Sequence, residues 1–210
     1  MALKYPNLKD HIFEYDLLSD QECDQIVSIL DDNEWRDFCW YNSDYEQVDI
    51  DKQSKMLSTR NNDATEIIQP HISEELFHAF HEKYHDSSIT TGDSFWENGS
   101  GIKFNKYNVG DYLSPHHDHI RDFFEGQFRG IPVTSVIGTL NDDYEGGEFV
   151  FWGDYKVEIK KGSVLAFPSI YLFPHEVKPV TKGVRYLSLI HISEPTRRRG
   201  ISYAVFCMKK

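Results

Sequence analysis

Short apolar segments separated by turn-forming residues fill the chain from Gly101 onward, and this pattern constrains the fold more than any other feature. The segments favour β-strands and cover residues 102–107, 133–140, 148–152, 155–159, 163–167, 171–177 and 184–186. Asparagine, aspartate and glycine fill the gaps, as in Asn141-Asp142-Asp143 and Gly146-Gly147. Many short strands without intervening helices predict a mainly β fold, either a β-sandwich or a jelly roll.

Residues 1–100 carry helical patterns instead. Ser19 and Glu22 form a capping-box pattern, and the apolar residues behind it recur at helical spacing, which predicts a helix over residues 20–31. A similar apolar spacing predicts a second helix over residues 71–85, with Pro70 in its first turn. We therefore expect an α+β domain in which residues 1–100 are a helical support packed on one sheet.

The composition limits the number of domains, the location and the partners. A chain of 210 residues accommodates one domain with a sizeable core. No apolar run approaches the roughly 20 residues of a membrane span, and the polar residues 1–16 do not resemble a signal peptide. Three irregularly spaced cysteines indicate a reducing compartment, so we expect a cytoplasmic protein without a membrane partner. The formal charge of −12 disfavours nucleic acid as a partner, and no feature specifies an oligomeric state.

The last segment, residues 187–210, has the character of a non-native tail. Residues 187–197 read LSLIHISEPTR and residues 201–207 read ISYAVFC, which resemble the in-frame translation of a common transposon-type sequencing adapter. The closing Lys209-Lys210 resembles translated poly-A. Such segments are excluded from fold reasoning, so we expect the domain core to cover residues 101–186. The alternative is a genuine basic tail.

Histidine and aspartate cluster in the segment Ser114-Pro115-His116-His117-Asp118-His119. Alternate residues of a strand point to the same face, so His116 and Asp118 can converge on one metal ion. His117 and His119 share the other face and are the competing pair. The segment alone leaves a chance cluster of surface histidines almost equally open.

A third potential ligand, His175, lies further along the chain, and Arg185 follows it. Two histidines and one carboxylate form the facial triad of non-haem Fe(II) oxygenases, which leaves coordination positions open for a cosubstrate and dioxygen. The pattern therefore predicts an iron site that combines His175 with residues of the 116–119 cluster.

These residues belong to an ordered set of motifs: Tyr107-x-x-Gly110, Pro115-His116-x-Asp118, Leu140-Asn141, Gly146-Gly147-Glu148-Phe149, Gly162-Ser163, Phe167-Pro168-Ser169, His175-x-Val177-x-Pro179-Val180 and Gly183-x-Arg185. The set resembles the 2-oxoglutarate/Fe(II) dioxygenase superfamily, and within it the prolyl 4-hydroxylase-like branch. This resemblance implies a double-stranded β-helix core, also called a jelly roll or cupin-like fold, over residues 101–186.

The resemblance also implies roles for individual residues. His116, Asp118 and His175 would ligate Fe(II). Arg185 would bind the C5 carboxylate of 2-oxoglutarate through its planar guanidinium, Tyr107 would offer its hydroxyl to the same carboxylate, and Thr139 would line that pocket. Dioxygen would be the co-reactant and ascorbate a reductant. The implied reaction is hydroxylation of an unactivated C–H bond with release of succinate and CO2.

The substrate favoured by the resemblance is a prolyl or other amino-acyl side chain in a peptide, with a free amino acid or small metabolite as the alternative. A nucleic-acid demethylase would carry a second arginine six residues after the first, and His191 occupies that position within the suspected tail. A non-enzymatic cupin-like module would lack part of the triad or Arg185. A metal-dependent hydrolase would require zinc and a nearby general base, and no HExxH motif is present.

Other conspicuous residues fit structural roles. Gly146, Gly147 and Gly162 are expected in tight turns that need a positive φ. Five further histidines have no partner pattern and are expected on solvated helices or loops: His11, His71, His78, His81 and His85.

Overall fold

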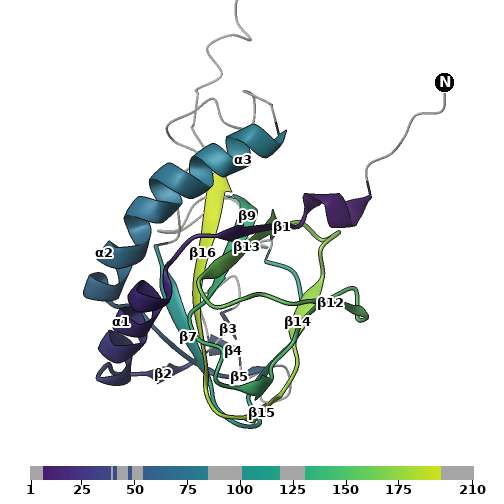
Figure 1. The fold of residues 1–210 in the computed structure, drawn as a ribbon. Helices are drawn as coiled ribbons and strands as arrows, with labels where there is room; N and C mark the ends of the chain where they lie inside the picture. The colour runs from purple at the N-terminus through teal and green to yellow at the C-terminus, as the bar shows by residue number, and fades with distance from the viewer. Residues whose placement is uncertain are drawn as a thin grey trace, which may run out of the picture.

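Two antiparallel sheets and a layer of helices form the fold (Figure 1). The computed structural model describes residues 7–38, 40–41, 47–48, 54–84, 101–118 and 131–194. The helices α1 (Asp20–Asp31) and α2 (Asn62–His71) cover the outer face of the larger sheet, α3 (Phe77–Tyr84) continues the line of α2, and the smaller sheet packs on the inner face of the larger one. The predicted mainly β fold with supporting helices is therefore confirmed.

The larger sheet has seven strands in the order β1 (Phe13–Asp16), β13 (Ser163–Pro168), β9 (Ile131–Thr139), β16 (Arg185–Glu194), β7 (Lys103–Tyr107), β6 (Leu57–Thr59) and β2 (Arg36–Asp37). The smaller sheet has five, in the order β12 (Tyr155–Val157), β11 (Phe149–Phe151), β14 (His175–Val177), β8 (Tyr112–His116) and β5 (Ser54–Lys55). Two short pairs and one turn of 3₁₀-helix complete the described elements: β10 (Glu145–Gly146) with β15 (Val180–Lys182), β3 (Trp40–Tyr41) with β4 (Gln47–Val48), and η1 (Leu8–His11).

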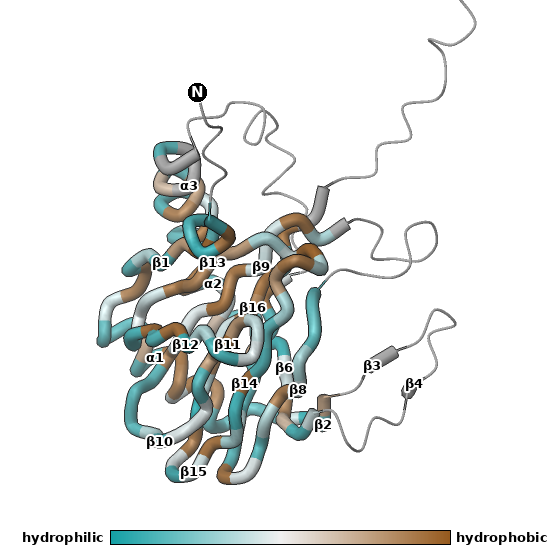
Figure 2. The backbone as a smooth tube through the Cα atoms, turned by 90° about the vertical axis from the view of Figure 1, so that its right-hand side faces the viewer, coloured by the Kyte–Doolittle hydropathy of each residue, from teal (hydrophilic) through white to brown (hydrophobic). Residues whose placement is uncertain are grey.

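Period-two alternation along the central strands divides the core into two layers. Ile190, Val136 and Ala166 are neighbours across β16, β9 and β13, and they pack against the helices. The adjacent row, Leu189, Ile137 and Leu165, faces the smaller sheet. Figure 2 shows hydrophobic residues concentrated along β13, β9 and β16. A register slip of one residue would exchange the two faces, so burial on both sides fixes the strand pairing.

The first predicted helix is confirmed, because α1 begins and ends where the capping box and apolar spacing place it. The Ser19 side chain accepts a hydrogen bond from the Glu22 backbone N–H at 3.3 Å, and the Glu22 carboxylate accepts one from the Ser19 N–H at 2.8 Å. Cys23, Ile26 and Leu30 share one buried face, which packs on the larger sheet.

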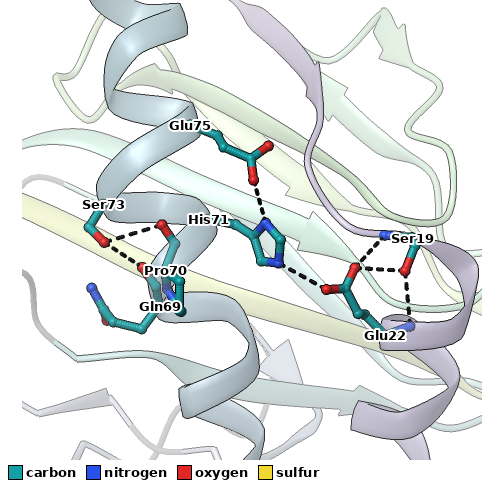
Figure 3. Close-up of polar contacts among 7 residues, drawn as sticks. All are labelled: Ser19, Glu22, Gln69, Pro70, His71, Ser73 and Glu75. Carbon is teal, nitrogen blue, oxygen red and sulfur yellow. Dashed lines mark hydrogen bonds and ion pairs between the residues drawn. The ribbon is translucent and has the colours of Figure 1, made fainter.

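The predicted start of the second helix is wrong. α2 begins at Asn62, where the Asn61 side chain accepts a hydrogen bond from the Ala64 N–H at 2.9 Å, and Pro70 lies inside the helix rather than in its first turn. Proline has no N–H, so one helical hydrogen bond is lost. The π-helical segment η2 (Ile72–Leu76) follows directly, and the Ser73 hydroxyl donates to the carbonyls of Gln69 and Pro70 at 2.8 and 3.2 Å (Figure 3).

The expectation that His71 is a solvated histidine without a partner is also wrong. Its Nε2 lies 3.0 Å from a Glu22 carboxylate oxygen on α1, and its Nδ1 lies 2.7 Å from the carboxylate of Glu75 (Figure 3). These contacts raise the pKa of His71 above its usual value, although burial alone would lower it. His78 is exposed as expected, whereas the side chain of His81 and all of His85 lie outside the described residues.

The strands predicted beyond Gly101 differ from the observed ones mainly at their ends. The expectation that residues 1–100 form a helical support is incomplete, because β1, β2 and β6 from this range join the larger sheet and β5 joins the smaller one. The segment 171–177 contributes only His175–Val177, and the segment 184–186 is the beginning of a strand that continues to Glu194. Leu187, Ile190 and Ile192 are buried in the two cores, while residues 195–210 lie outside the described part of the chain. The adapter origin of residues 187–210 stays a prediction. Within the described residues, no helix combines the length and apolar character needed to cross a membrane.

Candidate metal centre

The three predicted ligands converge between the sheets. His116 is the last residue of β8, and His175, the first of β14, is its cross-strand partner. Asp118 lies two residues beyond β8, so strand alternation does not itself carry it to the site. One potential ligand atom from each residue lies within 4.8 Å of the others. His117 is not in this group, and His119 lies outside the described residues.

Main-chain carbonyls orient both imidazoles. The Nδ1 of His116 lies 2.9 Å from the Ser114 carbonyl, and the Nδ1 of His175 lies 3.1 Å from the Phe173 carbonyl. A carbonyl only accepts, so each Nδ1 carries the proton and each Nε2 presents a lone pair. The two Nε2 atoms lie 3.4 and 3.6 Å from the Asp118 carboxylate oxygens. The three side chains therefore direct ligand atoms at one point.

The charge states suit metal binding. Burial lowers the pKa of His175 to about 4, so this imidazole is neutral at physiological pH. Burial alone would raise the pKa of Asp118, but the neighbouring histidines His175 and His191 hold it well below its usual value. A metal binds the neutral form of histidine and the ionised form of a carboxylate, so no deprotonation has to precede binding.

Aromatic side chains fix the ring of His175. Phe149 stacks on it with ring centroids 5.1 Å apart, and Phe167 meets it edge-on at 4.9 Å. His116 lies on another side, 4.3 Å between ring centroids. Such packing leaves the imidazole a single orientation, which is the preorganisation a metal site requires.

The second predicted pair also comes together, because Arg185 and Tyr107 are direct partners across β16 and β7. Arg185 is only 2% exposed. Its Nε donates to the Tyr144 hydroxyl at 3.1 Å, and its Nη1 is buried without a hydrogen-bond partner among the described residues. A buried guanidinium donor without a partner is costly, so this position suits an anionic ligand. Burial raises the pKa of Tyr107, so its side chain remains a neutral phenol.

Gly147 has a role that the turn interpretation did not include. Positive φ angles confirm the predicted turn geometry of the three glycines: 76° at Gly146, 65° at Gly147 and 82° at Gly162. A Cβ at Gly147 would also lie 3.2 Å from the Cδ of Arg185. The missing side chain therefore leaves room for the stem of the arginine.

A small cavity connects the triad with the inner face of the larger sheet. Its volume is about 30 Å³, and its lining includes the three ligands, Tyr107 and Asn105. Arg185 does not line it directly. The Oδ1 of Asn105 and the Oγ1 of Thr139 are buried without hydrogen-bond partners among the described residues. Because a cavity needs about 10–15 Å³ to hold a single water, this one has room for few waters, and a larger ligand requires the lining side chains to move.

Sequence reasoning missed three side chains near the site. The Ser135 hydroxyl donates to Asp118 at 2.5 Å, and the Nε2 of His191 lies 3.5 Å from the same carboxylate oxygen. Tyr144 holds Arg185, as described above. These contacts join residues distant in sequence, and no local motif signals them.

Comparison with known proteins identifies similar sequences and folds. Residues 102–192 match the family model described as the 2OG-Fe(II) oxygenase superfamily. A PKHD-type hydroxylase of Aliarcobacter butzleri is 37% identical over 100 residues, which cover 45% of this chain and 43% of the relative. Another from Stenotrophomonas maltophilia is 30% identical over 100 residues, covering 45% and 44%. The chain thus matches less than half the length of these curated relatives.

Solved structures share the fold at low identity. The viral collagen prolyl hydroxylase of Paramecium bursaria Chlorella virus-1 superposes with a TM-score of 0.61 and 20% identity, covering 86% of this chain and 94% of that one. A prolyl-4-hydroxylase of Pseudomonas putida gives 0.57 and 15%, covering 88% and 93%. At these identities the similarity establishes the fold alone.

Proposed function

We propose that this chain is an Fe(II)- and 2-oxoglutarate-dependent dioxygenase that hydroxylates an unactivated C–H bond, because residues 102–192 match the family model of the 2OG-Fe(II) oxygenase superfamily. The observation that carries the proposal is the group His116, Asp118 and His175, whose ligand atoms lie within 4.8 Å of one another. Two imidazoles and one carboxylate fit Fe(II) and leave coordination positions open.

In this proposal the residues of the chain bind and orient the iron and 2-oxoglutarate and shield them from water. Iron and 2-oxoglutarate, when bound, supply the oxidative decarboxylation that consumes dioxygen and yields succinate and CO2. His116 and His175 donate through Nε2, because their Nδ1 protons are bound to main-chain carbonyls. Phe149 and Phe167 keep the site apolar around His175. Such surroundings limit water access to the reacting centre.

Arg185 and Tyr107 are proposed to bind the far carboxylate of 2-oxoglutarate. The support is the buried Nη1 of Arg185, which has a donor to offer and no partner among the described residues. The Tyr144 hydroxyl accepts its hydrogen bond from Nε of Arg185, so Nη1 stays available for a ligand. Thr139 has a buried hydroxyl oxygen, also without a described partner, two strand positions from the level of Arg185. A guanidinium with a neighbouring phenol is a suitable partner for a carboxylate.

A peptide with a prolyl or other amino-acyl side chain is the proposed substrate. Similar folds include a prolyl hydroxylase from Trichoplax adhaerens in complex with a hypoxia inducible factor peptide fragment, at 17% identity and a TM-score of 0.58. The alternative is a free amino acid or small metabolite. A nucleic-acid demethylase is disfavoured by the charge of −12. The second arginine of that branch would fall at His191, inside the suspected tail, so this position does not discriminate between the branches. We also propose a reducing, cytoplasmic setting, in keeping with the free thiol of Cys23.

Succinate release tests the proposal. The chain would be incubated with Fe(II), 2-oxoglutarate and ascorbate, and with proline-containing peptides, free amino acids or methylated DNA in separate reactions. We expect substrate-stimulated succinate release with a peptide, and none from the Asp118→Ala variant. Absence of 2-oxoglutarate turnover under every condition would contradict the enzyme assignment. Turnover stimulated by a different class of substrate would correct the substrate alone.

A further inference from the structure

A short chain of buried hydroxyl groups ends on the candidate metal ligand Asp118. Ser135, on β9, is fully buried, and its Oγ lies 2.5 Å from the Oδ2 of Asp118. Ser169 follows β13, is 1% exposed, and its Oγ lies 2.8 Å from that of Ser135. The three side chains come from separate segments of the fold, so tertiary packing assembles the chain.

The direction of both hydrogen bonds follows from the donors available. A carboxylate that ligates a metal is ionised and has no proton to donate, so Asp118 accepts the hydrogen bond from Ser135. Ser135 therefore donates its single hydroxyl proton to Asp118. Ser169 must then donate to Ser135, because Ser135 has no second hydroxyl proton to give. Hydrogen bonds aligned in this way polarise and strengthen each other.

Ser135 engages one of the two oxygens of Asp118. A distance of 2.5 Å is that of a charge-assisted O–H···O⁻ bond. The Nε2 atoms of His191 and His175 also lie nearest to Oδ2, at 3.5 and 3.6 Å, whereas Oδ1 faces the Nε2 of His116 at 3.4 Å. Oδ2 already accepts the hydrogen bond from Ser135, so Oδ1 is the oxygen that keeps all of its lone pairs for a metal.

We infer that Ser135, supported by Ser169, is a positioning residue that fixes the Asp118 carboxylate so that it ligates the metal through Oδ1. The inference rests on the proposed metal centre. It also gives a function to the Phe167-Pro168-Ser169 motif, which the metal ligands and Arg185 leave without one. The Ser169 N–H donates to the Val133 carbonyl at 3.1 Å, which anchors Ser169 beside β9.

Metal titration of the intact chain tests the inference without relying on turnover. Co²⁺ would be titrated by calorimetry and by its visible absorption into wild type and Ser135→Ala. We expect Ser135→Ala to bind Co²⁺ 10–100-fold more weakly, the range typical for loss of a group that orients a ligand. The absorption of bound Co²⁺ should also change, because the carboxylate is no longer held in one orientation. Ser169→Ala should show a smaller loss of affinity.

Ser163→Ala is the matched control. Ser163 is equally buried, and its hydroxyl donates to Asp16 at 2.6 Å between β13 and β1. The Ser163→Ala variant loses a similar serine–aspartate hydrogen bond, but one away from the cavity, so its Co²⁺ affinity should stay at the wild-type value. Equal affinities for Ser135→Ala and wild type would overturn the inference. If Ser135→Ala does not fold, unchanged affinity in Ser169→Ala would overturn it equally.

The titration separates this inference from the proposed function. If wild type binds no Co²⁺, or if the Asp118→Ala variant binds it as tightly as wild type, the proposed metal centre is contradicted. Wild type that binds through Asp118, together with unaffected serine variants, would leave the metal centre intact and remove only the positioning role of Ser135.

Discussion

His116 and His175 are direct cross-strand partners, and their ring centroids lie 4.3 Å apart at the open end of β8 and β14. Each ring has its Nδ1 bound to the carbonyl of the residue two positions earlier in the chain. Two candidate ligands that are far apart in sequence thus each direct Nε2 toward the candidate metal position. One short ladder between two strands fixes two of the three candidate metal ligands.

The first prediction concerns the ligands. His116→Ala, Asp118→Ala and His175→Ala should each abolish 2-oxoglutarate turnover, because each removes one of three converging ligand atoms. His117→Ala, outside this group, should keep most of the activity. Succinate release measures the turnover of each variant, and Co²⁺ titration measures its metal binding. Loss of metal binding in His117→Ala with retention in His116→Ala would reverse the ligand assignment.

Arg185→Ala should separate cosubstrate binding from metal binding. It should still bind Co²⁺, but the KM for 2-oxoglutarate should rise by roughly a few hundred- to a few thousand-fold, since loss of one member of a buried charge pair costs about 3–5 kcal/mol. Tyr144→Phe, which removes only the acceptor for Nε, should have a much smaller effect. An unchanged KM in Arg185→Ala would exclude this residue from the cosubstrate site.

Gly147→Ala should damage the same subsite indirectly. The new methyl group would lie 3.2 Å from the Cδ of Arg185, at a φ of 65° that alanine rarely adopts. We expect a loss of about 1–2 kcal/mol of stability from the backbone strain, and a raised KM for 2-oxoglutarate with unchanged Co²⁺ affinity. Gly153→Ala has a comparable φ of 85° with nothing near its Cβ, so it should lose stability alone.

His71 should make stability depend on pH near neutrality. Its pKa is raised in the folded chain by Glu22 and Glu75, against the effect of burial. The resulting stabilisation is complete below the unfolded pKa, about 6.5, and is lost as the pH rises through the folded value. The melting temperature of wild type relative to His71→Gln should therefore be higher at pH 6 than at pH 9. His78→Gln, at an exposed position, is the control; a difference independent of pH would contradict the ion pairs.

The C-terminal segment predicts two different truncation phenotypes. A chain ending at Tyr186 should not fold, because it lacks the buried side chains Leu187, Ile190 and Ile192, worth about 1.5–3 kcal/mol each. If residues 187–210 are translated adapter, a chain ending at Glu194 should keep its melting temperature and Co²⁺ affinity. Trypsin should then cut the full chain first at Arg197–Arg199. Resistance there equal to that of the core would contradict the adapter origin.

Local signals were sufficient for some parts of the structure and not for others. The capping box at Ser19 and Glu22 lies within one turn, so it predicted α1 to the residue. The convergence of His116, Asp118 and His175 could be predicted because their motif specifies chemistry as well as position. His71 pairs with Glu22 from a distant part of the sequence, and Ser135 reaches Asp118 from another strand. Contacts of this kind arise only when the chain is folded, so no local pattern announces them.

The central position of β16 has a consequence for how the two halves of the site would open. Arg185 begins a strand that is hydrogen-bonded to β9 on one side and β7 on the other, whereas Asp118 lies beyond the end of β8. Amide hydrogens in a central strand exchange with solvent only when the whole domain opens, but those at strand ends exchange through local fraying. The backbone amide of Asp118 should therefore exchange through local fraying, whereas the interior of β16 beyond Arg185 should exchange only when the whole domain unfolds. Hydrogen exchange of the intact chain should thus show the metal side of the proposed site to be the less stable half.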